Sequence, residues 1–198
     1  MTKEHILEEA IRLFSINGFD GTSIQSIADA VGIKKQSLLY YFGSKEDLRE
    51  EIYKNVISHW KEKLPKLLAT KSGGYGRFTS IIESLITFLL EDKNRTRLII
   101  REILDRPDAV RKTASENLMP WVMIISDYIR MGQEAGIIKE SVDPESYITQ
   151  VIMMAMGTVA IGGVVTALVK TNDKVKIEPM IKELERIARE SLFKENKL

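Results

Sequence analysis

The sequence predicts an all-α fold of about nine helices, in which a small N-terminal three-helix domain precedes a larger helical domain. Apolar residues recur at three- and four-residue spacings along almost the whole chain, as on one face of a helix. The alternating apolar and polar runs that indicate strands are almost absent. Glycine, proline and serine fall between the helical segments, where helices begin and end.

Two short helices are expected at the start of the chain. The first carries apolar residues on one face over residues 6–14 and ends at Gly18, which suits a helix C-terminus. Either Thr22 or Ser23 provides an N-cap for the second, which ends at Gly32. Both helices are amphipathic, so we expect them to pack against each other.

A third helix from about Lys34 to Phe42 and a long fourth helix follow. Ser44 is placed to cap the fourth, and acidic residues in its first turn suit the helix dipole. We expect this helix to reach about Leu68, with one apolar stripe formed by Leu48, Ile52, Val56 and Trp60.

Four or five longer helical segments are expected after KSGGYG (71–76), which we interpret as a linker. The expected spans are Phe78–Leu90, Arg95–Leu104, Asp108–Ala135, a segment opened by DPES (143–146), and Pro179–Phe193. Pro120 should kink or split the third span, whereas Pro144 suits a first turn.

The second and third helices have the pattern of a helix-turn-helix. Ala28 lets the two helices cross closely, and Gly32 supplies the positive φ that a tight turn needs. Apolar side chains fill the angle between the helices: Ile27, Val31, Ile33 and Leu38. The side chains left pointing outward are Lys34, Lys35, Gln36, Ser37 and Tyr40.

These outward side chains suit contacts with duplex DNA. Lysine reaches guanine O6 and N7, and a glutamine amide pairs with adenine N6 and N7. Hydroxyl groups, amines and the N-terminal amides of a helix bind phosphates. The alternative interpretation is a solvated helix face with capping residues. Because the net charge is only +1, a nucleic-acid surface must be local.

The segment also carries a family pattern. Residues 14–28 read F-x-x-x-G-F-x-G-T-S-I-x-x-I-A, and residues 30–48 read AVGIKKQSLLYYFGSKEDL. Over about residues 5–50 the chain resembles the DNA-binding domain of the TetR family of transcriptional repressors. The resemblance implies an entirely helical dimer, with a helix-turn-helix DNA-binding domain (1–46) and an effector-binding and dimerisation domain (47–198).

The resemblance and the chemistry of the side chains give two sets of expected DNA contacts. The phosphate set is Thr22, Ser23, Lys34, Tyr40, Tyr41 and Lys45. The base-edge set is Gln25, Lys35, Gln36 and Ser37. Two positions depart from the family: Leu39 replaces a common tyrosine, and Lys34 replaces a frequent serine that would cap the recognition helix. We interpret Lys34 as a phosphate contact.

The segment Ser146–Val169 has no charged residue and is long enough to span a bilayer. We prefer a helix buried in a soluble dimer, because polar residues dilute its hydrophobicity and the resemblance implies a four-helix bundle across a two-fold axis. Small residues and the apolar stripe of the final helix would meet there. The expected dimer residues are Ala160, Gly163, Ala167, Ile181, Leu184 and Ala188.

A small, hydrophobic effector is expected to bind in the second domain. Aromatic side chains would form stacking walls and methionines an adaptable lining, although plain core packing is the alternative. The expected contacts are Phe88, Arg101, Trp121, Tyr128 and Met154. Arg97, Arg101, Glu102 and Asp105 lie at helical spacing, so they either pair on the surface or let Arg101 meet an acidic effector.

No catalytic or metal site is indicated. There is no cysteine, and neither histidine, His5 or His59, has metal-ligand spacing or a nucleophile partner. GGYG (73–76) lacks the Lys-Ser/Thr ending of a phosphate loop. We therefore expect no enzyme, cofactor or metal, and, without a signal peptide, a cytoplasmic location.

The predicted function is a dimeric, ligand-responsive DNA-binding regulator, a repressor that a small effector releases from a palindromic double-stranded operator. The alternatives are a helical binding module that does not read DNA and a membrane-anchored helical protein.

Overall fold

The computed structural model describes residues 2–68, 74–169 and 178–194, and within them the regular structure is helical, as predicted. Ten helices lie in these ranges: α1 (Lys3–Asn17), α2 (Ile24–Val31), α3 (Lys35–Phe42), α4 (Lys45–Leu68), α5 (Gly74–Glu91), α6 (Lys93–Asp105), α7 (Pro107–Asn117), α8 (Met119–Glu134), α9 (Pro144–Val169) and α10 (Glu178–Leu192). There are ten rather than about nine because the segment expected at 108–135 is split before Pro120.

The chain folds into two compact units, each discontinuous in sequence. The first unit combines residues 1–62 with 94–113, and the second combines 63–93 with 114–198. Helix α4 runs without a break past residue 46 and contributes to both units. The polypeptide therefore passes from one unit to the other three times.

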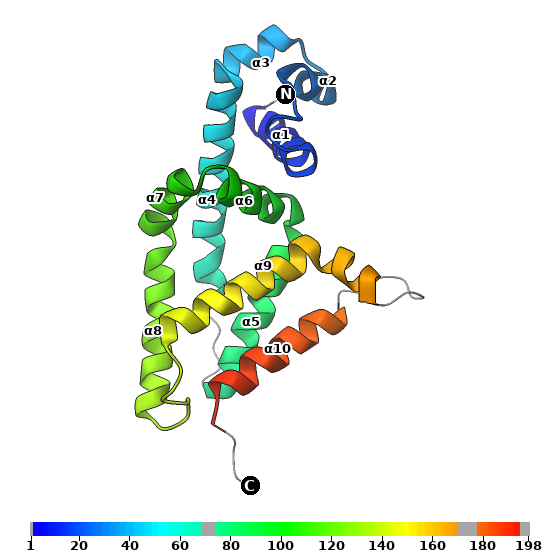
Figure 1. Ribbon diagram of the computed structural model, residues 1–198. Coiled ribbons are helices and arrows are strands. Elements are labelled where there is room, and N and C mark those ends of the chain that lie inside the picture. The colour runs from blue at the N-terminus through cyan, green and yellow to red at the C-terminus, as the bar shows by residue number, and fades with distance from the viewer. Residues whose placement is uncertain (1, 69–73, 170–177, 195–198) are drawn as a thin grey trace. The chain divides into compact units, whose positions relative to one another are not determined.

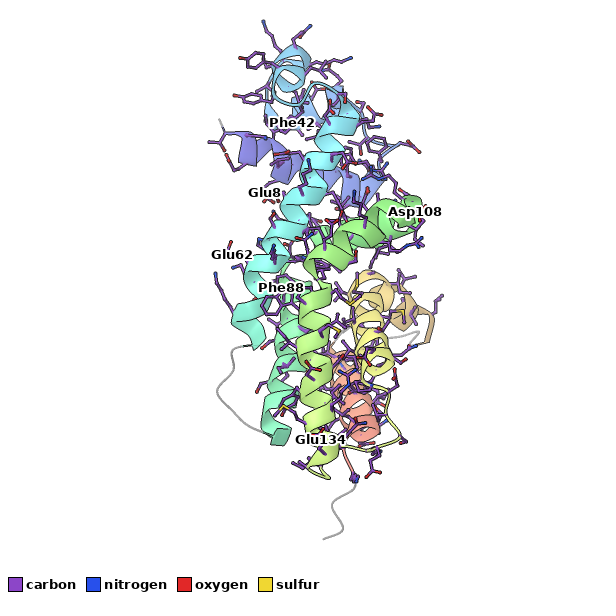
Figure 2. All side chains as sticks on the ribbon, turned by 90° about the vertical axis from the view of Figure 1, so that its left-hand side faces the viewer. Glu8, Phe42, Glu62, Phe88, Asp108 and Glu134 are labelled. Carbon is purple, nitrogen blue, oxygen red and sulfur yellow. The ribbon has the colours of Figure 1, made fainter. Side chains whose placement is uncertain are left out.

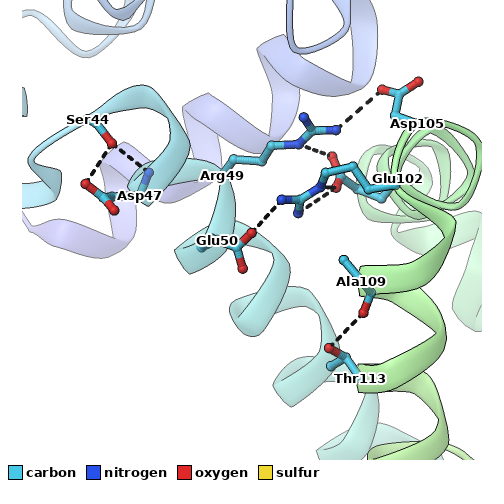
Figure 3. A network of polar contacts seen from close by, with 9 residues as sticks. Ser44, Asp47, Arg49, Glu50, Glu102, Asp105, Ala109 and Thr113 are labelled. Atoms are coloured by element: carbon cyan, nitrogen blue, oxygen red, sulfur yellow. Dashed lines mark hydrogen bonds and ion pairs between the residues drawn. The ribbon is translucent and has the colours of Figure 1, made fainter.

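In the first unit, α1, α2 and α3 are grouped at the start of α4 (Figure 1). Gly18 ends α1, as predicted. Ser23, rather than Thr22, caps α2, because the Ser26 N–H donates to the Ser23 Oγ at 2.9 Å. Ser44 caps α4 by accepting from the Asp47 N–H at 3.0 Å (Figure 3).

The apolar stripe predicted for α4 is confirmed. Leu48, Ile52, Val56 and Trp60 are all buried. They are spaced four apart, so one face of α4 points into protein over four turns. Burial of this face fixes the rotation of α4 about its own axis.

In the second unit, α9 packs against α5, α8 and α10, and α10 also contacts α5 (Figure 1). Gly136 follows α8 with a φ of 72°, and Pro144 begins α9. The expected linker is partly wrong, because residues 74–76 already belong to α5. Its residues 71–73 lie outside the described ranges.

Among the described residues, one helix is long and apolar enough to cross a membrane: residues 144–165 of α9, with a mean hydropathy of 1.9. Its first half packs inside the second unit through Ile148, Val151 and Ala155, which are buried. Its second half exposes four large apolar side chains: Ile161, Val164, Val165 and Leu168.

Candidate nucleic-acid interface

The turn between α2 and α3 depends on Gly32. Its φ of 78° and ψ of 35° are left-handed, a conformation that costs a residue with a side chain free energy. The Gly32 N–H donates to the Asp29 carbonyl at 3.1 Å, and the Ile33 N–H to the Ala28 carbonyl at 2.9 Å. These two bonds close the end of α2 and direct the chain into α3.

The inner face of the helix pair is apolar. Ile27, Ala28 and Leu38 are each 0% exposed, and Phe42 is buried at the end of α3. Figure 2 shows Phe42 beside α3, with other side chains of this end of the unit projecting away. The inner residues hold α3 at a fixed angle to α2, so the side chains on the outer face of α3 keep fixed positions relative to α2.

Most of the predicted DNA contacts are exposed, on α3 and at the start of α2. The exposed members are Ser23, Gln25, Lys34, Lys35, Gln36, Ser37, Tyr40 and Tyr41. Tyr40 is 89% exposed and meets Tyr41 edge to face, with ring centroids 6.2 Å apart. The described surface thus combines cations, amides and phenol hydroxyls.

Besides Ser23, which caps α2, the side chains of Gln25 and Thr22 also make hydrogen bonds within the protein. The Gln25 amide donates to Asp29 at 2.7 Å, which leaves its carbonyl oxygen available. Thr22 is buried, and its hydroxyl donates to the Gly18 carbonyl at 2.8 Å. The structure therefore places the Thr22 side chain between α1 and α2 and not on the outer face.

Lys34 is the N-cap of α3 and provides no side-chain cap, as expected from its replacement of serine. Its ammonium is exposed next to Lys35. Together they make the beginning of α3 cationic, where the positive end of the helix dipole also attracts anions. This end of the helix is the strongest local candidate for phosphate binding.

Lys45 is held by a residue that the sequence did not single out. Its Nζ lies 4.2 Å from the centroid of the Phe19 ring, and the Arg49 Cζ lies 4.3 Å from the same centroid. A cation over an aromatic ring is attracted to the negative face of that ring, so the Phe19 ring helps to fix the positions of both cations. Phe19 precedes α2, so this contact joins α4 to the α1–α2 connection.

The expected effector residues are divided between the two units. Phe88 is buried in the second unit, where Trp121, Tyr128 and Met154 are half-buried. Arg101 belongs to the first unit, and its Nη2 donates to the Ile16 carbonyl at the end of α1, 3.2 Å away. Arg101 therefore caps a helix, and its assignment to an acidic effector loses support.

The interpretation of the α6 charges as surface pairs is also incomplete. Glu102 is buried, 3% exposed, and lies among charged residues of α4 and α6 and the single residue between α6 and α7. We call this group the ionic cluster; it consists of Arg49, Glu50, Glu102, Asp105 and Arg106 (Figure 3). Sequence spacing placed Glu102 and Asp105 on one helix but gave no sign of their partners on α4.

The expected dimer residues do not share one exposed surface. Leu184 and Ala188 are buried within the second unit, whereas Gly163 and Ala167 are exposed and Ala160 and Ile181 are half-buried. Leu184 and Ala188 face the other helices of their own unit, so a partner cannot reach them without rearrangement. The exposed apolar residue of α10 is Ile187.

No group of three or more His, Asp or Glu side chains is arranged to hold a metal ion within the described part of the chain.

Comparison with known families accounts for both parts of the chain. Residues 6–52 match the model described as bacterial regulatory proteins, tetR family. Residues 46–189 match the model described as YsiA-like protein, C-terminal region.

The curated relatives are named as transcriptional regulators. The biofilm operon negative regulator IcaR of Staphylococcus epidermidis is 27% identical over 116 residues, 59% of this chain and 60% of the relative. The probable regulator YttP of Bacillus subtilis is 26% identical over 139 residues, 67% of this chain and 65% of the relative. The chain thus spans less than two thirds of the length of these relatives.

Solved structures of the same fold cover almost all of the chain. A transcriptional regulator from Saccharomonospora viridis in complex with choline has a TM-score of 0.73 at 20% identity, covering 96% of this chain and 97% of the other. FadR from Bacillus subtilis in complex with stearoyl-CoA has a TM-score of 0.70 at 17% identity, with coverages of 96% and 99%. These structures show the fold, and the family matches over residues 6–52 and 46–189 show that the chain belongs to the TetR family of bacterial regulatory proteins.

Proposed function

We propose that this protein is a dimeric repressor that binds a palindromic operator and is released from it by a small effector. The observation that carries the proposal is the outer face of α3, where Lys35, Gln36 and Ser37 are exposed above a buried Leu38. Each protomer would insert α3 into a major groove, with the two recognition helices about 34 Å or more apart. The description of IcaR as a negative regulator supports the repressor role.

The proposed DNA contacts fall into two groups. Lys35, Gln36 and Ser37, with Gln25 from α2, read base edges. Ser23, Lys34, Tyr40, Tyr41 and Lys45 hold phosphates. Thr22 supports them from inside by fixing the connection between α1 and α2.

A second copy of the chain would cover the exposed apolar side chains of α9 and α10. The exposed apolar residues are Ile161, Val164, Leu168 and Ile187. Gly163 and Ala167, which are near the α9 residues in sequence, are small and would let a partner helix approach closely. Burial of this surface in a symmetric contact removes apolar area from water and suits a two-fold operator.

The effector would bind in the second unit, and we propose a hydrophobic molecule with one polar group. Phe88, Trp121, Tyr128 and Met154 are its candidate contacts. Ser126 joins them, because it is 0% exposed and its hydroxyl has no hydrogen-bond partner among the described residues. Stearoyl-CoA, bound by a protein of the same fold, carries a long apolar chain.

Effector and DNA would be linked through α4, which is continuous between the two units. A ligand releases DNA only if it binds the two conformations with different affinity. We propose that the conformation favoured by the effector holds the recognition helices at a spacing that the operator does not fit.

Selection from random duplexes tests the repressor proposal. Purified protein should enrich a palindromic sequence, because two copies of α3 read the same bases on opposite strands. The absence of any preference for double-stranded DNA, even at low ionic strength, would contradict the proposed function.

Replacement of Gln36 by alanine should relax base preference at one position of each half-site. The loss of a bidentate amide contact is expected to reduce discrimination there by about 1–3 kcal/mol. Competition binding with duplexes substituted at each position measures this. Gln150→Ala, an exposed glutamine on α9, serves as the control. An equal loss of affinity for every sequence would show that Gln36 does not contact a base.

Replacement of Lys45 by alanine should weaken binding to all duplexes alike. The slope of log K against log salt is negative, and one phosphate contact fewer makes it less steep by about one. Fluorescence anisotropy at several salt concentrations gives the slope. Lys54→Ala, an exposed lysine farther along α4, is the matched control and should leave it unchanged. An unaltered slope in Lys45→Ala would remove Lys45 from the phosphate set.

A further inference from the structure

Glu102 lies at the centre of the ionic cluster and connects two arginines. Its Oε1 accepts from the Arg49 Nε at 2.7 Å, and its Oε2 accepts from the Arg106 Nε at 3.0 Å. Arg106 also donates to Glu50, and Arg49 lies 3.5 Å from Asp105. The five residues alternate in charge, so the buried carboxylate has a cationic partner at each oxygen (Figure 3).

Such a cluster is a poor source of stability but a good source of fixed geometry. Burial of a carboxylate and two guanidinium groups removes their hydration, and this loss largely cancels the attraction between them. The planar guanidinium, however, can donate hydrogen bonds to a carboxylate in only a few relative orientations. The cluster therefore restricts how α4 can rotate or slide against α6, to which Glu102 belongs.

The restriction extends to the DNA-binding face through Phe19. Arg49, which Glu102 holds, lies over the Phe19 ring together with Lys45, one turn earlier on α4. Phe19 in turn contacts Phe14 of α1, with ring centroids 5.5 Å apart. A shift of Arg49 would thus disturb Lys45 and the α1–α2 connection together.

Helix α6 also contacts α1, through three polar interactions. The Ser15 hydroxyl donates to Asn94 at 3.1 Å, Arg95 pairs with Glu8, and Arg101 donates to the Ile16 carbonyl. Within the first unit, α6 therefore serves as the support against which both α1 and α4 are positioned.

We propose that Glu102 is a positioning residue for operator binding: it sets α4 against α6 and so fixes the orientation of α3 and Lys45. The inference rests on the proposed function, because it concerns the spacing of two recognition helices in a dimer. Glu102 does not touch DNA itself. Its removal should loosen the half-site spacing that the dimer accepts and leave base preference within a half-site intact.

The test uses the full chain and the palindrome selected by the wild-type protein. Glu102→Gln keeps the size of the side chain but removes its charge. Asp108→Asn, in an exposed pair with Arg111, is the matched control. Affinities are measured for the palindrome, for duplexes with one base pair added or removed between the half-sites, and for a duplex with one half-site base changed. Circular dichroism gives the folded fraction, to which all affinities are corrected.

We expect Glu102→Gln to lose about tenfold in affinity for the natural spacing, and to lose most of the preference for it over the shifted spacings. The half-site base change should cost the same factor as in wild type. If Glu102 only stabilised the fold, Glu102→Gln would lower the affinity for every duplex by the same factor, which is set by the folded fraction. Spacing and affinity profiles that match wild type after correction would overturn the inference.

A second variant keeps the test decisive if Glu102→Gln folds poorly. Arg49→Met/Glu102→Leu replaces the pair by apolar side chains, which proteins tolerate well, and it should broaden the accepted spacing in the same way. An unchanged spacing profile in this double variant would also overturn the inference. Failure of the wild-type protein to select any palindrome would instead reject the proposed function.

Discussion

Leu38→Ala is expected to destabilise the first unit by about 2–5 kcal/mol, because it leaves a cavity in the core where α3 packs against α2. Leu38 is 0% exposed, and Tyr40, two residues farther along α3 and therefore on nearly the opposite side of the helix, is 89% exposed. Its loss would remove apolar contacts from a small core that has few residues to compensate. DNA binding should fall with the folded fraction.

The measurement is urea unfolding followed by circular dichroism. Leu39→Ala is the matched control, since it removes the same atoms from the next position of the same helix, where the side chain is only half-buried. Leu39→Ala should lose clearly less stability than Leu38→Ala. Equal losses would mean that α3 is rotated from the orientation described above, and its outer face would have to be reassigned.

Arg49→Met is expected to lower the free energy of unfolding by about 3–5 kcal/mol, because it leaves the buried Glu102 carboxylate without one of its two cations. The Arg49 side chain is 12% exposed and Glu102 is still less so, so water cannot replace the lost partner. Arg106 remains on the other carboxylate oxygen. The variant also removes the cation from above Phe19.

Thermal and urea unfolding measure the effect, and the double variant with Glu102→Leu completes a thermodynamic cycle. Glu102→Leu should recover much of the loss, because an apolar pair needs no hydration. Arg111→Met breaks an exposed pair on α7 and should have no measurable effect. Arg49→Met would contradict the buried cluster if it behaved like Arg111→Met.

Features set by neighbouring residues were predictable from the sequence. Gly32 and Ser44 act within one helix turn, so their residue types alone indicate a left-handed turn and an N-cap. The apolar stripe of α4 and the exposed Lys35 and Gln36 follow from helical periodicity in the same way.

Features that depend on residues far apart in the sequence could not be predicted from it. Glu102 has the spacing of a surface residue, and only the approach of α4 makes it a buried ion. Phe19 and Lys45 are far apart in sequence but meet in the fold. The apolar stripe of a helix also does not indicate whether the same chain or a partner covers it. The stripe on α10 was assigned to a partner, whereas Leu184 and Ala188 are covered by their own chain.

The division of the first unit between residues 1–62 and 94–113 has a consequence for biosynthesis. A ribosome releases the helix pair that reads DNA early, but α6, its support, emerges only after α5 has been made. Residues 63–93 are therefore synthesised between the two parts of the first unit, and the free-energy cost of bringing two such parts together grows only slowly with the length of chain between them. We therefore expect the first unit to be completed only after residue 113 has been synthesised, which under the proposed function would delay operator binding.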